Sequence, residues 1–191
     1  MRLAGLALLC GVTIGITLGV LMAQHRGASG LAANGIGALR AVPSLAVMAV
    51  MLPLIGIGFK PALIALTILA IPPVLINTQA GFLSVDPAVL EAGRGVGLSP
   101  WQVIIRVQFP LALPVILAGV RIATVEVLAS ATIGAVIGAG GLGEYIFAGL
   151  GLGPAYVHLV LVGAVTVALL ALIAELLFGA GERLARRALF Q

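Results

Sequence analysis

Charged residues are scarce in this chain of 191 residues: they make up 8% of the sequence, against about 25% in a typical soluble protein. Aromatic residues are also sparse at 5%, too few to predict an aromatic cage for a cation. Hydrophobic residues, in contrast, make up 62%. A single core in a chain of this length cannot bury so much apolar surface. The composition therefore predicts an integral membrane protein whose solvent is the lipid bilayer.

Side chains that commonly hold metals or nucleotides are few as well. Cys10 is the single cysteine, which excludes an internal disulfide and a cysteine-based zinc cluster. His25 and His158 are isolated, without a second ligand at metal-binding spacing, so we expect no metal site. The single lysine, Lys60, lies in no G-x-x-x-x-G-K-[ST] pattern. We therefore expect no ATP site of that kind and no catalytic residues in this chain.

Five segments come near the roughly 20 apolar residues that a bilayer crossing requires. They are residues 3–23, 41–59, 61–76, a stretch within 111–137, and 156–178. The third is short and contains Pro72 and Pro73, which are expected to end or kink it. Gly11, Gly15 and Gly19 lie on one face of the first, a spacing that lets helices approach closely. The sequence predicts an all-α membrane protein with five transmembrane helices, in one domain over residues 1–191.

Basic residues give a net charge of +4, but they are too few and too scattered to form a nucleic-acid surface. They indicate the topology instead, because cytoplasmic loops carry an excess of arginine and lysine. Placing the 77–110 segment in the cytoplasm leaves only Arg2 and Lys60 outside. With Arg40 near the same side, it brings six arginines inside: Arg26, Arg94, Arg106, Arg183, Arg186 and Arg187. We therefore expect the N-terminus outside the membrane and the C-terminus in the cytoplasm.

The segment of about residues 82–110 contains the start signals of two short helices. Asp86 is a suitable N-cap for the first, and Pro87 suits the first helical position. This helix is expected to end near Gly97, because glycine commonly follows the last turn of a helix.

The second short helix begins at a second set of signals. Ser99 is the expected N-cap, Pro100 follows it, and Gln102 completes a capping box. Pro110 is expected to close this helix. Two short helices at a sharp turn predict a compact cytoplasmic knob, although composition alone equally allows an interfacial helix pair anchored by Trp101.

This segment resembles the EAA loop of the permease subunits of binding-protein-dependent ABC importers. The family pattern is E-A-A, three residues, G, nine residues, and I-x-L-P. At the same spacings this chain has Glu91-Ala92-Gly93, Gly97 and Val107-Gln108-Phe109-Pro110. Gly93 stands where the family has its second alanine. Because a glycine costs a helix about 1 kcal/mol relative to alanine, the first helix is expected to be looser than usual.

Six stretches are similar to the osmoprotectant branch of this family, which imports glycine betaine, carnitine, choline and related solutes. They are VPSLA at 42–46, LIGIG at 54–58, VDPA at 85–88, SPWQ at 99–102, PLALP at 110–114 and GAGGLG at 138–143. A permease for methionine or another amino acid has a similar core and is the alternative within the class. From another class, an ion-coupled secondary transporter is the alternative, although no convincing internal repeat supports it. A non-transporting scaffold is disfavoured by the polar residues inside the spans.

The resemblance implies an importer in a prokaryotic cell membrane. Two copies of this permease, or one copy and a paralogue, would form the pathway. Two ATPase subunits would bind ATP and magnesium, an external solute-binding protein would deliver the solute, and this chain would hold no cofactor. The loop would couple the permease to an ATPase subunit: Glu91 would contact the ATPase or lock the knob, Gly97 would allow the turn, and Pro110 would transmit force to the fourth helix. The residues of this coupling loop are Glu91, Ala92, Gly93, Gly97, Trp101 and Pro110.

Glu126 lies near the middle of the fourth span, where an ionised group is costly and usually faces a cavity or a partner. One interpretation is an acid in the pathway that attracts a cationic group of the solute. The other is a structural partner, for example across a dimer interface. Further candidates for the pathway are Asn77, Gln79, Thr124, Ser130 and Thr132.

Gly138, Gly140, Gly141 and Gly143 match the pattern G-x-G-x-x-G. No strand precedes this stretch, so a dinucleotide site is not expected. At the outer end of the fourth span, the glycines predict either a flexible outer gate or a simple reversal of the chain.

Overall fold

The computed structural model describes residues 2–24 and 44–190, and all regular structure in these residues is helical. The long helices are α1 (Arg2–Gln24), α4 (Phe59–Leu83), α7 (Phe109–Ile133) and α9 (Val157–Phe190). The shorter ones are α3 (Ser44–Ile55), α5 (Pro87–Gly95), α6 (Pro100–Val103) and α8 (Gly143–Leu152). A π-helical turn, η1 (Ile104–Gln108), joins α6 to α7, and two 3-10 turns flank α8, η2 (Gly134–Ile137) and η3 (Pro154–Tyr156).

Four helices in the described residues are long and apolar enough to cross a membrane, one fewer than the five predicted. They are Arg2–Gln24, Phe59–Leu83, Pro100–Ile137 and Pro154–Arg187. The segment predicted as the second span forms α3, whose 12 residues are fewer than the roughly 20 that a crossing requires. Gly56 and Gly58 follow it with φ angles of 91° and 114°, which end the helix. Residues 41–43 of that predicted span lie outside the described part.

The third predicted span is longer than expected, because α4 continues through Pro72 and Pro73 to Leu83. The two prolines remove backbone donors from the helix, and both are buried among neighbouring elements. One turn further on, the Asn77 side chain donates a hydrogen bond from Nδ2 to the carbonyl oxygen of Pro73 at 2.8 Å. Packing therefore sustains a helix that the local sequence alone would interrupt.

The predicted glycine face of α1 is confirmed as the contact with α4. A Cβ atom on Gly11 would lie 2.5 Å from the Cβ of Ala70, and one on Gly15 would lie 2.8 Å from that of Val74. A Cβ atom on Gly19 would lie 2.6 Å from the Cβ of Thr78. Residues four apart on α1 thus meet residues four apart on α4, so the two helices run in the same direction at very close range.

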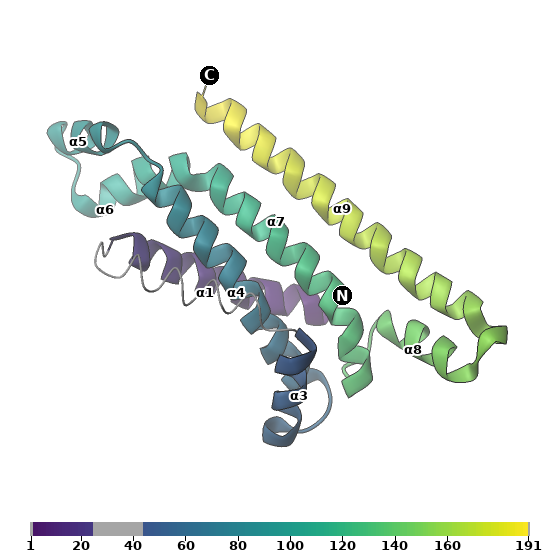
Figure 1. Ribbon diagram of the computed structural model, residues 1–191. Coiled ribbons are helices and arrows are strands. Elements are labelled where there is room, and N and C mark those ends of the chain that lie inside the picture. Colours follow the sequence, from purple (N-terminus) through teal and green to yellow (C-terminus); the bar gives the residue numbers. More distant parts are fainter. Residues whose placement is uncertain (1, 25–43, 191) are drawn as a thin grey trace.

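The remaining long helices alternate in direction. Gly81 of α4 lies beside Ala112, whereas Asn77 lies beside Gly119, so α4 and α7 are antiparallel. Helix α9 returns along α7 and carries the C-terminus back (Figure 1). One end of the bundle therefore holds α5, α6 and the end of α9, and the opposite end holds α3 and α8 (Figure 1).

Candidate functional site

Helix α5 begins and ends as its sequence predicts. Asp86 caps it, since its Oδ1 accepts a hydrogen bond from the backbone N–H of Ala88 at 2.8 Å, and Pro87 occupies the first turn. The helix ends at Gly95, and Gly97 follows with a φ of 88°, a left-handed conformation that favours glycine. This residue turns the chain toward α6.

Helix α6 has the predicted capping box but not the predicted end. The Ser99 Oγ accepts from the N–H of Gln102 at 3.4 Å, and the Gln102 Oε1 accepts from the N–H of Ser99 at 2.9 Å. Pro110 does not close this helix. It lies in the first turn of α7, directly after the π-helical turn η1, and the helical path runs on through both. The second knob helix and the spanning helix therefore form one continuous helical segment from Pro100 to Ile137.

Two glutamines that the sequence did not single out join the knob to the membrane helices. Gln108 is buried, and its Nε2 donates to the carbonyl oxygen of Phe82 on α4 at 3.0 Å. Its Oε1 accepts from the Nε2 of Gln24, at the end of α1, at 3.3 Å. The ring of Phe82 also meets that of Phe109 edge-on, with centroids 6.2 Å apart. The sequence did contain a signal for this link. Gln108 lies in an apolar stretch, and a buried amide requires hydrogen-bond partners.

The knob exposes apolar side chains. Trp101 is 66% exposed and Val96 is 80% exposed, and Val89 and Ile105 are also exposed. Glu91 and Ala92 are also exposed, whereas Gly93 is buried between the two short helices. We call Val89, Val96, Trp101 and Ile105 the knob patch. Exposed apolar residues gathered at one end of a chain are typical of a surface that binds another protein.

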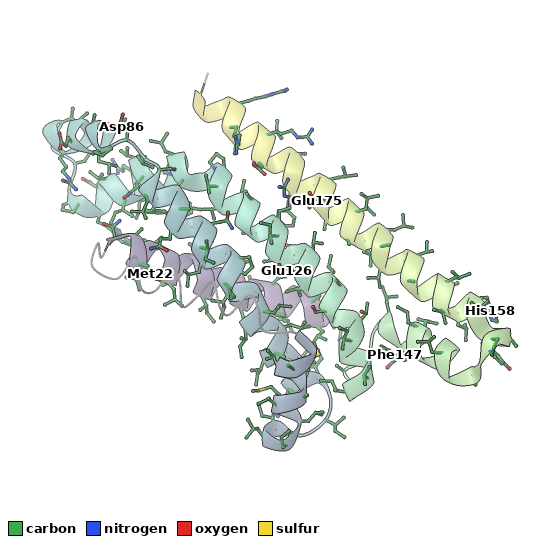
Figure 2. The ribbon with its side chains drawn as sticks, viewed as in Figure 1. Met22, Asp86, Glu126, Phe147, His158 and Glu175 are labelled. Atoms are coloured by element: carbon green, nitrogen blue, oxygen red, sulfur yellow. The ribbon has the colours of Figure 1, made fainter. Side chains whose placement is uncertain are left out.

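Among the candidate pathway residues, Glu126 differs from the other acids of the membrane helices. Arg121 on α7 lies 3.6 Å from Glu175 and 3.5 Å from Glu182, both on α9, and Glu182 also pairs with Arg186 at 3.2 Å. No hydrogen bond or ion pair within the described residues reaches Glu126, which lies near the middle of α7 (Figure 2).

Among the other candidates, Ser130 lies one turn from Glu126 on the same side of α7, whereas Thr124, Asn77 and Thr132 do not gather around Glu126. Gln79 is buried on α4. The Thr124 hydroxyl donates to the carbonyl oxygen of Val120 within α7 at 2.8 Å, and this residue is buried. Asn77 is held by its bond to Pro73, against Gly119 of α7. Ser130 is half-buried. Thr132 donates to its own helix and lies at the end of the bundle that holds α3 and α8.

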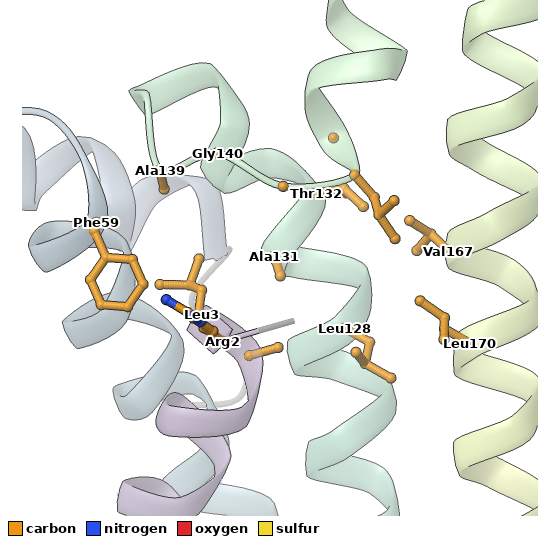
Figure 3. Close-up of a pocket in the computed structure, with 14 residues that line it drawn as sticks. Arg2, Leu3, Phe59, Leu128, Ala131, Thr132, Ala139, Gly140, Val167 and Leu170 are labelled. Atoms are coloured by element: carbon orange, nitrogen blue, oxygen red, sulfur yellow. The ribbon is translucent and has the colours of Figure 1, made fainter.

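The glycine stretch reverses the chain between η2 and α8. Gly138, Gly140 and Gly141 have φ angles of 73°, 77° and 103°. Gly143 begins α8 so close to the carbonyl oxygen of Thr132 that a Cβ atom has no room. Beside this turn lies a pocket of about 290 Å³ between α1, α7 and α9, mostly apolar but with Arg2 in its wall (Figure 3).

Comparison with known proteins identifies the class of protein that this architecture represents. The chain belongs to the family described as the binding-protein-dependent transport system inner membrane component, whose sequence pattern matches residues 11–187. It is 40% identical to the carnitine transport permease protein OpuCB of Listeria monocytogenes over 173 residues, which are 91% of this chain and 78% of the relative. It is 37% identical to the glycine betaine/carnitine/choline transport system permease protein OpuCB of Bacillus subtilis over 179 residues, 93% of this chain and 81% of the relative.

A solved structure has the same fold. The inward-facing MetNI methionine ABC transporter contains a chain that matches with a TM-score of 0.84, covering 96% of this chain and 91% of that chain at 23% identity. At this identity the match shows the fold alone. The prediction of an all-α ABC importer permease is therefore confirmed, and this chain is a multi-pass membrane permease subunit.

Proposed function

We propose that this permease imports a quaternary ammonium osmoprotectant, such as glycine betaine, carnitine or choline, with energy from ATP hydrolysed on a separate subunit. The observation that carries the proposal is the similarity, over nine-tenths of the chain, to permeases named for these solutes. ATP and magnesium bind the partner ATPase in this proposal, and the permease holds no cofactor.

The proposed assembly has two permeases, two ATPase subunits and an external solute-binding protein. The second permease is either a copy of this chain or a paralogue. The knob patch and the neighbouring Glu91 supply the surface for the ATPase, because they are exposed at one end of the bundle. Gln108 transmits movement of the knob, since it ties the knob to the ends of both α1 and α4. The π turn that carries it leads directly into α7.

The proposed topology places the knob and the C-terminus in the cytoplasm and the N-terminus outside. Five described arginines support it, because they lie on the knob or on the last turns of α9: Arg94, Arg106, Arg183, Arg186 and Arg187. Arg2 and Lys60 lie toward the opposite end. This distribution agrees with the excess of basic residues in cytoplasmic segments.

At the outer end, we propose that the glycine turn of residues 138–143 is the gate of the pathway. Three left-handed glycines allow backbone conformations that other residues resist, and the adjacent pocket gives the turn room to move. The pathway itself follows the side of α7 that carries Glu126 and Ser130.

Reconstitution tests the proposed solute. The permease, its ATPase and its binding protein are placed in proteoliposomes, and ATP-dependent uptake of labelled choline, glycine betaine, carnitine and methionine is measured. Uptake of one or more quaternary ammonium compounds, with none of methionine, is the expected result. Uptake of methionine alone would replace the osmoprotectant with an amino acid. Uptake that follows an ion gradient without ATP would contradict the ATP-driven mechanism.

A further inference from the structure

One acid of the membrane helices, Glu126, has no ion-pair partner within the described residues. Arg121 is the one cation among the described residues of α7. It forms ion pairs with Glu175 and Glu182 of α9. Because Glu182 also pairs with Arg186, the two arginines and the two glutamates neutralise one another. No positive charge of this cluster remains for Glu126.

Glu126 also points away from that cluster. It follows Arg121 by five residues, which places it about 140° around the helix from the arginine and from α9. The α4 side of α7 is marked by Gly119, which lies against Asn77. Glu126 is only half-buried in the single chain, at the edge of that contact. An ionised carboxylate in this position requires a cavity or a partner from outside the chain.

An identical second permease brings no described cation to this depth. The contact between Gly119 and Asn77 in antiparallel helices puts Glu126 level with about Ala70 of α4. Lys60 is ten residues from that level, which is about 15 Å along the helix axis. The described arginines outside the ion-paired cluster lie near the two ends of the bundle. Because a copy of this chain offers no described cation at this depth, the cation that the proposed function supplies here is the passing solute.

We propose that Glu126 lines the translocation pathway and selects for solutes with a net positive charge, a conclusion that rests on the proposed osmoprotectant function. A quaternary ammonium group has a diffuse charge and no N–H donor, so a carboxylate attracts it by electrostatics rather than by a hydrogen bond. In a site of low dielectric constant this attraction is large. Choline is stabilised by the full electrostatic attraction to Glu126, because it has no carboxylate. Glycine betaine gains less, because its own carboxylate is repelled by Glu126.

The substitution Glu126→Gln tests the proposal, because it keeps the shape and removes the charge. In proteoliposomes with saturating binding protein, the kcat/KM for choline is expected to fall about tenfold relative to that for glycine betaine. Glu126→Asp keeps the charge and is expected to keep the ratio within about twofold of wild type. Glu175→Gln is the matched control. It removes one carboxylate on the other side of α7 while Glu182 still holds Arg121, so the ratio is expected to stay unchanged.

The outcomes separate this inference from the function on which it rests. If the wild-type transporter moves neither solute, the osmoprotectant assignment fails. If it moves both, and Glu126→Gln slows both equally or slows neither, Glu126 is a structural residue and the inference is overturned. A lower thermal stability of the permease dimer with an unchanged ratio would indicate a partner across the dimer interface. If Glu126→Gln does not assemble, Glu126→Asp tests the inference instead. A kcat/KM for choline that falls far below wild type relative to that for glycine betaine in Glu126→Asp would overturn the inference.

Discussion

Gly93 and Gly97 of the knob have opposite backbone requirements, although they are only four residues apart. Gly93 is helical and buried, and a Cβ atom there would meet Val103 and Val107 at 3.7 Å, an ordinary van der Waals distance. We predict that Gly93→Ala stabilises the knob by about 1 kcal/mol, because alanine is the better helix former. Gly97→Ala is predicted to destabilise it by about 1–2 kcal/mol, because its φ is 88°.

Hydrogen exchange of the α5 amides measures both effects. The exchange is expected to be slower in Gly93→Ala and faster in Gly97→Ala. Gly95→Ala is the control: this residue is in the same helix, but no atom lies within 4 Å of the added Cβ, so only the helix propensity changes. Faster exchange in Gly93→Ala than in Gly95→Ala would mean that the contact with η1 has no room for a methyl group.

The contact between α1 and α4 is a property of two elements rather than of one residue. We predict that Gly15→Val separates them and destabilises the permease by about 1–3 kcal/mol, since even a Cβ would lie 2.8 Å from Val74 and 3.1 Å from the carbonyl oxygen of Ile71. Gly5→Val is the matched control, because Gly5 is exposed on the same helix with no atom within 4 Å. Thermal unfolding in detergent measures the difference. Equal melting temperatures for the two variants would contradict the close contact.

Coupling to the ATPase involves the knob patch and the link through Gln108. Trp101→Ala is predicted to leave the melting temperature unchanged, because the ring is 66% exposed, while copurification with the ATPase is lost. Gln108→Met is predicted to keep copurification but to lower uptake at least about tenfold, because it removes the hydrogen bonds to Phe82 and Gln24. The two variants thus separate docking from transmission. Normal uptake by a well-assembled Gln108→Met protein would show that the link is not needed.

Local signals predicted some elements well and others poorly. The ends of α5 and the capping box of α6 depend on nearby residues, Asp86 and Ser99 among them, and they were predicted correctly. The apolar helix α8 gives no comparable signal. Its return along α9 depends on contacts between the two helices, such as Gly149 with Val160 and Gly163 with Ile146. The π turn before Pro110 was not predicted either.

The candidate site was predictable only in part. The residues of the knob are close together in the sequence, whereas the pathway candidates lie on helices that are far apart in it. The knob is a local structure, so its sequence pattern placed its residues on one exposed unit. The proposed pathway involves helices far apart in the sequence, and positions such as Thr124 and Thr132 could not be assigned to faces in advance. The structure places Thr124 in a buried position and Thr132 beside the pocket between α1, α7 and α9.

At the scale of the whole molecule, the two ends of the bundle differ in their number of basic residues. The end with the knob and the C-terminal turns of α9 carries five described arginines, whereas the end with α3 and α8 carries Arg2 and Lys60. The membrane potential and the anionic inner leaflet both favour basic residues on the cytoplasmic side. The orientation of the permease is therefore expected to follow from this difference.

Cysteine labelling tests that orientation, and Cys10 makes it simple because it is the sole thiol. In a Cys10→Ser background, single cysteines replace Lys60 and Leu150 at one end, and Val96 and Leu184 at the other. All four positions are exposed in the single chain, and the permease is expressed without its ATPase so that the knob patch around Val96 stays uncovered. An impermeant maleimide applied to intact cells is expected to label positions 60 and 150 only, and opening the cells is expected to add 96 and 184. The reverse pattern would place the knob outside, where no ATPase can reach it, and would remove the proposed coupling mechanism.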